Sequence, residues 1–482
     1  MIFLNSKNIL LVHPLGYRKE AAGKDIARIA SIIPPIGLAG IAAYLEKRGI
    51  DVSIIDCYAR PDSDSLIRGY LQSEKPAFLG LSCTTSTFLD GVRTAKLAKS
   101  ILPDIKVIFG GAHVSALKER ILKDFPVIDF TVIGEGEETL AELMEKNGED
   151  ISSVPGIIYR EKENEILFTG RRSTGIDLDT LPFPSYEKLE GFPSAYKAPL
   201  FSYPKAPSSS CITSRGCPYA CSYCDRSVFG RSFRYNSAEY MYEHVNYLNA
   251  RFGVKHIIFY DDQFTFKRER IVDFAKMMIN RPRRIYFNCV ARAEHIDYEL
   301  LLMLKEAGCW MISLGIETGD ENLLARHRQN ANLSMLSEKI HLIKKAGIRT
   351  KGLFMIGLPG ETEEGIRKSV KFVISNPIDE LNVAKFTPFP GSPIYEKIHE
   401  MGEFNEDWEL MDCMNFLFIP EGMTKERLEE LFKLFYRKHF RRSEILLGYT
   451  SMIWRSPDSW KRVLQNLPSL FKFVKSDKRL GT

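Results

Sequence analysis

The sequence has no apolar run long enough to cross a bilayer. The longest apolar stretch near its start covers residues 32–45 and contains Pro34 and Pro35, whereas a transmembrane helix needs about 20 consecutive apolar residues. We therefore expect neither a transmembrane helix nor a cleavable signal. With 482 residues, 44% of them apolar and 26% charged, the chain has the composition of a folded protein with two or three hydrophobic cores.

The even, spread-out set of cysteines typical of a disulfide framework is also missing. Of the nine cysteines, three lie within eight residues, as Cys217, Cys221 and Cys224. Such crowding favours a metal site in a reducing compartment, because disulfides are rare in the cytosol. The sequence therefore predicts a cytoplasmic protein with a metal centre near residue 220.

No nucleic-acid-binding motif accompanies the positive charge. The net charge of +5 is concentrated in residues 424–482, which hold 14 Lys and Arg against 6 Asp and Glu. Without a motif or aromatic stacking platforms beside this charge, we expect no nucleic-acid partner. Two interpretations stay open: a helical subdomain with a solvated basic face, or peripheral contact with an anionic membrane surface that admits a lipid-like substrate.

The first 148 residues lack the GxGxxG fingerprint of a dinucleotide-binding domain, because the chain reads VHPLGY at its first apolar segment. NAD and FAD are therefore disfavoured. Short apolar segments nevertheless alternate with helical patterns, which predicts an α/β fold with a doubly wound, Rossmann-like domain over residues 1–148. Ligands of such sheets lie at the carboxyl ends of the strands. The expected strands are residues 9–14, 52–57, 77–83, 106–111 and 129–138.

A second alternation of strand and helix patterns follows a stretch of different composition. Residues 149–204 contain a hairpin pattern that turns at residues 162–164, followed by a proline-punctuated linker. Residues 205–400 contain six strand patterns separated by helical patterns, which predict a partial (β/α)6 barrel of the TIM type. Residues 401–482 are predicted to form a helical, basic C-terminal region.

The clustered cysteines form the pattern CPYACSYC, a CxxxCxxC arrangement after the first strand of the expected barrel. Three thiolates leave one iron of a [4Fe–4S] cluster without a protein ligand, and that iron can chelate an amino acid's amine and carboxylate. The alternative is a structural zinc site, which needs a fourth ligand; the nearby thiol is Cys211, and no second CxxC pair exists. With the aromatic Tyr223 before the last cysteine, the pattern resembles the signature of the radical S-adenosylmethionine superfamily.

This resemblance implies an S-adenosylmethionine site at the ends of the barrel strands. After the second strand, where the family binds the methionine amino group, this chain has Asp261 and Asp262 in place of Gly-Gly-Glu, and which acid serves stays open. Arg292 matches an arginine that faces the cofactor carboxylate in relatives, although a structural salt bridge explains it equally well. Polar side chains for ribose and a glycine-rich strand end for adenine follow. The implied S-adenosylmethionine contacts are Tyr223, Asp261, Asp262, Arg292, Ser313, Glu317 and Gly357.

Residues 8–148 resemble the cobalamin-binding domain that precedes the barrel in one branch of the superfamily. The DxHxxG motif, which supplies a lower axial histidine in many cobalamin proteins, is missing, so we expect cobalamin bound without histidine ligation. The chain as a whole is similar to the anaerobic magnesium-protoporphyrin monomethyl ester cyclase-like branch. The implied cobalamin contacts are Ser82, Thr84, Thr85, Gly110, Gly111, His113, Gly134 and Glu135.

Together these resemblances imply an enzyme with a [4Fe–4S] cluster, S-adenosylmethionine and cobalamin, supplied with electrons by a donor such as flavodoxin or ferredoxin. It would generate a 5′-deoxyadenosyl radical and functionalise an unactivated carbon of a small molecule, with C-methylation as the leading interpretation. Cyclase-type oxidation or ring rearrangement of a tetrapyrrole or lipid-like substrate needs the same cofactors and stays open. A non-catalytic cobalamin or iron–sulfur carrier, or a redox sensor, is disfavoured because it needs no S-adenosylmethionine pocket.

Overall fold

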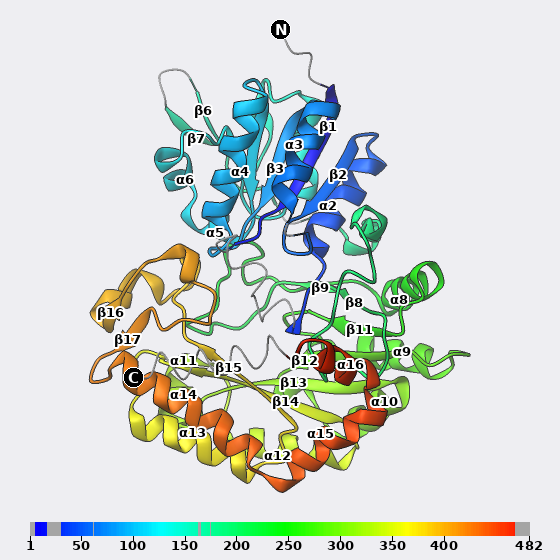
Figure 1. The fold of residues 1–482 in the computed structure, drawn as a ribbon, viewed down its shortest axis with the longest axis vertical. Helices are drawn as coiled ribbons and strands as arrows, with labels where there is room; N and C mark the ends of the chain where they lie inside the picture. Colours follow the sequence, from blue (N-terminus) through cyan, green and yellow to red (C-terminus); the bar gives the residue numbers. More distant parts are fainter. Residues whose placement is uncertain (1–4, 17–29, 61, 162–164, 174, 468–482) are drawn as a thin grey trace.

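The structure, a computed structural model, describes residues 5–16, 30–60, 62–161, 165–173 and 175–467. In Figure 1 an N-terminal α/β domain lies above a second α/β domain, and the helices over residues 425–440 and 443–455 run along the side of the second domain remote from the first. No helix in these ranges is long and apolar enough to span a bilayer.

The N-terminal domain is built on a seven-stranded sheet in the order β2-β1-β3-β4-β5-β6-β7. Its first five strands are parallel. They are β1 (Asn5–His13), β2 (Asp51–Asp56), β3 (Pro76–Ser82), β4 (Lys106–Gly110) and β5 (Phe130–Val132). The central strand β3 is buried except at its last residue, because helices cover both faces of the sheet. The predicted doubly wound fold is confirmed.

Two hydrophobic cores lie on the two faces of this sheet. Leu38 of α2 packs in one core with Ile9 and Leu11, whereas Leu71 of α3 packs in the other with Leu10. Strand β1 divides its side chains in this way because successive residues of a strand point to opposite faces. The helices of this domain are α2 (Ile36–Lys47), α3 (Ser63–Glu74), α4 (Phe88–Ile101), α5 (Ala112–Leu117), α6 (Glu119–Asp124) and α7 (Glu137–Glu145).

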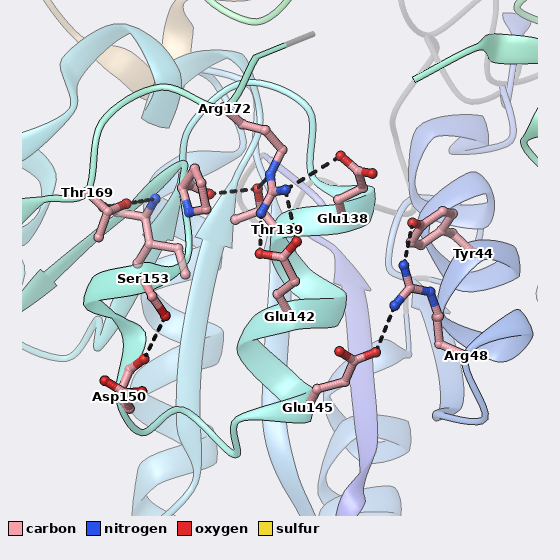
Figure 2. Close-up of polar contacts among 12 residues, drawn as sticks. Tyr44, Arg48, Glu138, Thr139, Glu142, Glu145, Asp150, Ser153, Thr169 and Arg172 are labelled. Atoms are coloured by element: carbon pink, nitrogen blue, oxygen red, sulfur yellow. Dashed lines mark hydrogen bonds and ion pairs between the residues drawn. The ribbon is translucent and has the colours of Figure 1, made fainter. Parts of the chain in front are cut away.

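Polar contacts fasten α7 to its neighbours (Figure 2). Arg172 donates from Nη2 to Glu142 Oε2 at 2.5 Å and from Nε to Thr139 Oγ1 at 2.9 Å. On the other side of α7, Arg48 of α2 donates to Glu145 Oε1 at 3.0 Å. Helix α7 is therefore tied both to α2 and to the chain that follows β7.

The predicted hairpin extends the N-terminal sheet instead of standing apart in a linker. Its strands are β6 (Ile157–Arg160) and β7 (Ile166–Phe168), and β6 pairs antiparallel with β5. The predicted turn at residues 162–164 lies outside the described residues. The hairpin satisfies main-chain groups that β5 would otherwise expose at the sheet edge.

The second domain is an open sheet of six parallel strands in the order β15-β14-β13-β12-β11-β8. The strands are β8 (Ser208–Cys211), β11 (His256–Phe259), β12 (Tyr286–Ala291), β13 (Cys309–Glu317), β14 (Arg349–Ile356) and β15 (Glu380–Lys385). The helices are α8 (Ala238–Phe252), α9 (Arg268–Ile279), α10 (Tyr298–Ala307), α11 (Glu321–His327), α12 (Leu333–Lys345) and α13 (Glu363–Ser375). Several begin where a side chain caps the first turn, as Ser237, Asp297 and Thr362 do. The predicted partial barrel is confirmed.

The C-terminal region forms α-helices only from Lys425 onward. Before that point, where a helical region was predicted, the chain forms the antiparallel pair β16 (Gly402–Phe404) and β17 (Phe418–Pro420). Aromatic and β-branched residues in these short segments favour strands. The helices that follow are α14 (Lys425–Phe440), α15 (Ser443–Arg455) and α16 (Pro457–Gln465).

Candidate functional site

The three clustered cysteines lie on a loop beyond the carboxyl end of β8. A two-stranded antiparallel ribbon, β9 (Ser214–Arg215) and β10 (Arg234–Tyr235), closes the base of this loop. Gly216 opens it with a φ of +85°, and a Cβ on this residue would lie 1.9 Å from the carbonyl oxygen of Ser232. Only glycine allows such a close approach, so the residue before Cys217 fixes where the loop begins.

The thiols of this loop lie close to one another and to two polar side chains. Gln263 Nε2 donates to Cys217 Sγ at 3.5 Å, and Arg292 Nη1 lies 3.9 Å from Cys221 Sγ. A hydrogen bond from the Cys224 thiol and the positive charge of the arginine lower the pKa of Cys221 to about 5. Within the described ranges, no three His, Cys, Asp or Glu side chains are arranged to hold a single metal ion. A thiolate facing a guanidinium is nevertheless a competent metal ligand, since metals bind thiolates.

Cys211, the fourth thiol of the zinc alternative, is a core residue. It ends β8 and is fully buried. Its Sγ lies 4.0 Å from His244 Nε2, and the same nitrogen lies 3.1 Å from Tyr186 Oη. Cys211 therefore packs as a small hydrophobic residue against α8.

Two histidines that the sequence analysis missed hold the cysteine loop in place. Ser222 Oγ lies 2.8 Å from His327 Nδ1, whose other ring nitrogen, Nε2, lies 2.8 Å from the Pro359 carbonyl oxygen. Because a carbonyl only accepts, Nε2 carries the proton of the neutral ring and Nδ1 accepts from the serine. Tyr219 Oη lies 2.6 Å from His295 Nε2. Neither histidine stands in a motif, so only the folded chain reveals their role.

Arg292 combines a salt bridge with a position beside the loop. Its Nε donates to Glu294 Oε1 at 2.6 Å, and its guanidinium carbon lies 3.7 Å from the centroid of the Tyr219 ring. Its Nη2 donates to the Gln329 carbonyl oxygen. The salt bridge considered from the sequence is thus present, while Nη1 faces Cys221.

The structure separates the roles of the two adjacent acids. Asp261 is buried and accepts hydrogen bonds from the Thr213 N–H at 2.7 Å, Thr213 Oγ1 at 2.9 Å and Ser214 Oγ at 2.7 Å. Asp262 is exposed and forms no hydrogen bond or ion pair with any described residue. Burial and the negative charge of Asp262 raise the pKa of Cys217, which places this carboxylate near the first cysteine. Asp262 is therefore the acid that is free to meet an ammonium group.

Ser313 and Glu317 lie on one face of β13, four residues apart. Glu317 has a φ of +68°, which is uncommon for a residue with a side chain and recurs at functional sites. Burial raises its pKa; the charge of Arg328, whose Nη1 lies 3.9 Å away, and a hydrogen bond with Tyr223 oppose that rise. The structure thus brings together two predicted contacts, Tyr223 and Glu317.

The main chain at Gly357 is held by a buried acid that was not predicted. The Gly357 N–H donates to Glu361 Oε2 at 2.5 Å and the Leu358 N–H donates to the same oxygen at 3.3 Å. The other oxygen, Oε1, has no partner among the described residues. Burial raises the pKa of Glu361 to about 8. The N–H of Gly357 is therefore already paired with a carboxylate. In the sequence GLPGE, the only indication of this contact is a single acid in an apolar segment.

A cavity of about 1300 Å³, including space open to solvent, lies between the two domains. The strand ends of the N-terminal sheet form one wall, and Val228 and Phe229 of the cysteine loop belong to the other. The predicted cobalamin contacts that line it are Ser82, Gly110, Gly111, Gly134 and Glu135.

The chemistry of the cavity wall fits a large cofactor such as cobalamin. Gly37 and Gly40 of α2 line the cavity, and a Cβ on either would meet no atom within 4 Å. At Gly111, with a φ of +103°, a Cβ would lie 2.4 Å from the Cys83 carbonyl oxygen, so the strand-end turn requires glycine. The remaining wall is largely apolar, with Ile36, Leu38, Ile41, Leu81, Ile108, Val132 and Leu140 among its residues.

Three further residues predicted as cobalamin contacts, Thr84, Thr85 and His113, do not line this cavity. The His113 ring is fully buried, lies 4.5 Å from the Trp408 ring and has its Nδ1 3.2 Å from Thr85 Oγ1. Burial lowers its pKa to about 3. The Thr84 N–H donates a hydrogen bond to Thr87 Oγ1 at 2.9 Å. Helix α5 begins at Ala112 and turns the histidine into the core.

Glu135 lines the cavity but also joins the two domains. Its carboxylate forms ion pairs with Arg215 and Arg234, on the two strands of the ribbon below the cysteine loop. Glu137 pairs with Arg215 at 2.6 Å. From the sequence, Glu135 was an implied cobalamin contact; its ion pairs could not be foreseen, because both arginines lie some 80 residues or more further along the chain.

Two protein families match the chain. The B12 binding domain family matches residues 24–144, and the Radical SAM superfamily matches residues 211–373. The first match includes strands β2 to β5, and the second runs from Cys211, the last residue of β8, through the cysteine loop to β14 and α13. The two matched families therefore correspond to the two sides of the cavity.

Relatives and solved structures match most of this chain. An uncharacterized methyltransferase of Pyrococcus horikoshii is 29% identical over 91% of this chain and 94% of its own length. An anaerobic magnesium-protoporphyrin IX monomethyl ester cyclase of Rubrivivax gelatinosus is 27% identical over 91% of this chain and 78% of its own. The structure of the radical S-adenosylmethionine methyltransferase TsrM of Kitasatospora setae superposes with a TM-score of 0.69 at 17% identity, covering 91% of this chain and 89% of that one. At this identity the superposition shows a shared fold.

The fold and the two family matches define an enzyme that joins a cobalamin-binding domain to a radical S-adenosylmethionine barrel. The chain belongs to the cobalamin-dependent radical S-adenosylmethionine enzymes, whose cofactors are a [4Fe–4S] cluster, S-adenosylmethionine and cobalamin. Its relatives include both methyltransferases and anaerobic cyclases.

Proposed function

We propose that this enzyme transfers a methyl group to an unactivated carbon of a small-molecule substrate. The observation that carries the proposal is the shared cavity, which Gly110 and Gly134 of the sheet edge line together with Val228 and Phe229 of the cysteine loop. A cofactor held at the carboxyl ends of the N-terminal strands would therefore face the loop that would hold the cluster. When bound, the cofactors supply hydrogen abstraction from carbon and a methyl group for the resulting radical.

The cysteine loop is proposed to hold the cluster through Cys217, Cys221 and Cys224, which leaves one iron for S-adenosylmethionine. Asp262 is assigned to the methionine amine, because its carboxylate is free beside Cys217, whereas Asp261 is used by Thr213. The residues proposed to bind S-adenosylmethionine are Tyr223, Asp262, Arg292, Ser313, Glu317 and Gly357.

The N-terminal wall is proposed to hold cobalamin through Ser82, Gly110, Gly111 and Gly134, with no histidine ligand to cobalt. His113 is buried away from the cavity wall, which supports this mode of binding. The apolar side chains of the wall exclude water from the reacting atoms, which protects a carbon radical from side reactions.

Methyl transfer is preferred to cyclase-type oxidation or ring rearrangement of a tetrapyrrole or lipid-like substrate. The relative named a methyltransferase matches 91% of this chain and 94% of its own length, whereas the cyclase matches 78% of its own. The likeness to the cyclase keeps the oxidative reaction as the second candidate.

The chain organisation that we propose keeps a cobalamin-binding domain over residues 1–148, extended by the hairpin of the following segment, 149–204. A barrel over residues 205–400 and a C-terminal region over residues 401–482 complete it. We infer an electron donor of the flavodoxin or ferredoxin kind and a cytoplasmic location, which the nine free cysteines support.

The test is anaerobic reconstitution with iron, sulfide and cobalamin, followed by dithionite and S-adenosylmethionine carrying a deuterated methyl group. Metal and cobalamin contents are measured, and 5′-deoxyadenosine and S-adenosylhomocysteine are quantified by mass spectrometry. The control replaces Cys217, Cys221 and Cys224 by Ala.

Cysteine-dependent 5′-deoxyadenosine together with S-adenosylhomocysteine is the result expected of a methyltransferase. Formation of 5′-deoxyadenosine without S-adenosylhomocysteine would favour the cyclase-type reaction. Zinc in place of iron, or a cluster that never cleaves S-adenosylmethionine, would overturn the assignment of the cysteine loop.

A further inference from the structure

Helix α15 presents an apolar face to solvent. The exposed fractions are 56% for Leu446, 71% for Leu447, 52% for Ile453 and 72% for Trp454. These residues stand at positions i, i+1, i+7 and i+8, which form one stripe along a helix. On the opposite side, Met452 is buried. Because α15 is apolar on both sides, its outer stripe is not the solvated face of an ordinary amphipathic helix.

The neighbouring helices also expose apolar side chains. Phe440 at the end of α14 is 42% exposed, and Leu464 of α16 is 61% exposed. Single exposed apolar residues are normal on a protein surface, whereas a group of them marks an interaction site. We call the residues Phe440, Leu446, Leu447, Ile453, Trp454 and Leu464 the apolar face.

Unpaired positive charge accompanies the apolar face. Arg437, Lys438 and Arg441 near the end of α14 and Lys461 of α16 are exposed and form no ion pair within the described ranges. The one acid of α15, Glu444, is held by Arg442 at 2.8 Å. The sequence beyond residue 467 continues the pattern with four further Lys and Arg against one Asp. The unpaired charge on α14 and α16 is therefore positive.

We propose that the apolar face docks on an anionic lipid surface. Apolar side chains on a helix lie among lipid headgroups and acyl chains while Lys and Arg meet the lipid phosphates, and this combination is that of a peripheral membrane helix. A second copy of this chain fits less well, because a symmetric contact would bring two basic surfaces together. In Figure 1, α15 lies at the end of the molecule remote from the N-terminal domain, so docking there leaves the cavity side free.

The test is sedimentation of the reconstituted full-length protein with vesicles of phosphatidylcholine alone or with about one third phosphatidylglycerol, at low and at physiological salt. The variant carries Leu447→Glu and Trp454→Glu together. The matched control is Leu302→Glu, on α10, which is 47% exposed and lies outside the apolar face. Circular dichroism and bound iron verify that each protein is folded.

We expect the parent protein and the Leu302→Glu control to sediment with anionic vesicles and only weakly with neutral ones. The double variant should lose at least about tenfold in vesicle affinity, which corresponds to ~1.4 kcal/mol. Equal binding by the double variant and its control would overturn the proposal. A dimer in solution that the double variant converts to a monomer, with no vesicle binding by the parent, would also overturn it and assign the face to a second copy. None of these readouts depends on methyl transfer.

Discussion

At the scale of single residues, Gly40 of α2 lines the cavity with empty space in front of it. Glycine within a helix costs about 0.5–1 kcal/mol relative to alanine, so a side chain here would favour the helix while filling the cavity. We predict that Gly40→Leu leaves the thermal unfolding temperature unchanged or slightly higher. Its affinity for cobalamin should fall by at least about tenfold, or ~1.4 kcal/mol.

The matched control for this prediction is Gly69→Leu on α3, since a Cβ on Gly69 also meets no atom within 4 Å and this residue does not line the cavity. Absorbance titration of the two proteins with cobalamin, beside their melting curves, makes the comparison. Equal affinities would show that α2 does not form the wall that meets the cofactor.

The two adjacent acids give a second prediction at this scale. Asp261→Asn places an amide where the Thr213 N–H and two hydroxyls need acceptors, which costs about 1–3 kcal/mol and lowers the unfolding temperature. Asp262→Asn should leave the unfolding temperature unchanged and slow 5′-deoxyadenosine formation by about tenfold or more, consistent with loss of ~1.4 kcal/mol of binding. Melting curves and product quantification at several S-adenosylmethionine concentrations check both. A fully active Asp262→Asn enzyme would contradict the assignment.

Sequence motifs point to residues that lie close together because they are neighbours along the chain, such as the three clustered cysteines. The cysteine spacing and the glycine before Cys217 belong to one loop, so their proximity could be inferred directly. Glu361 and His327 act through contacts with the main chain of segments that only the fold brings near, and no spacing announces them. His113 follows a strand-end glycine pair but does not line the cavity, because helix α5 turns its ring into the core.

At the scale of elements, a short 3-10 segment in the C-terminal region packs onto the N-terminal domain. Trp408 lies against His113 of α5 and Phe88 of α4, with ring centroids 4.5 and 5.7 Å apart. Arg120 of α6 lies 5.4 Å from the Trp408 ring, and Arg93 of α4 pairs with Glu409 at 2.7 Å. The aromatic contact therefore buries a histidine between parts of the chain almost 300 residues apart.

This burial predicts a pH dependence of stability. The folded pKa of His113 is about 3, below its ordinary value of 6.5, because of burial and the charge of Arg120. Between these pH values the unfolded chain therefore binds one more proton than the folded chain. The contribution of the neutral, buried His113 to the free energy of unfolding is complete above pH 6.5 and is lost as the pH falls toward 3. We predict that His113→Phe reduces the loss of stability between pH 7 and pH 5 by about 2 kcal/mol.

Denaturant unfolding at pH 7 and pH 5, followed through tryptophan fluorescence, measures this effect. The exposed His341→Gln, on α12, is the control and should keep the pH dependence of the parent. If His113→Phe loses as much stability as the parent on acidification, the histidine does not stay neutral in the folded state.

Alternation of apolar and helical patterns predicted both sheets, because each parallel strand is buried on two faces and reads as an apolar run. The hairpin was also visible, but its attachment to β5 depends on a free sheet edge, which a sequence pattern does not show. The strand pair β16 and β17 is only three residues long on each side, too short for a period-two pattern to distinguish it from a loop.

At the scale of the whole molecule, the cavity exists only while the two domains stay together. Arg215, beside the cysteine loop, links Glu135 and Glu137 of the N-terminal domain, and the side chain of Glu137 is only 8% exposed. A buried carboxylate that loses its partner costs up to about 3–5 kcal/mol. The ion pairs of Arg215 therefore contribute strongly to holding the N-terminal domain against the barrel.

Arg215→Ala should loosen the contact between the domains without separating them, because Arg234 still pairs with Glu135 and Trp408 still packs on the N-terminal domain. We predict at least about a tenfold loss of cobalamin affinity, or ~1.4 kcal/mol, and a larger radius of gyration in X-ray scattering. The control is Arg172→Ala, because Arg172 is equally exposed at 18% and pairs with Glu138 and Glu142 inside the N-terminal domain (Figure 2). This variant removes the same charge without touching the domain contact, so its radius should match the parent. Equal cobalamin affinity in the two variants would show that the sheet edge alone, without the barrel, holds the cofactor.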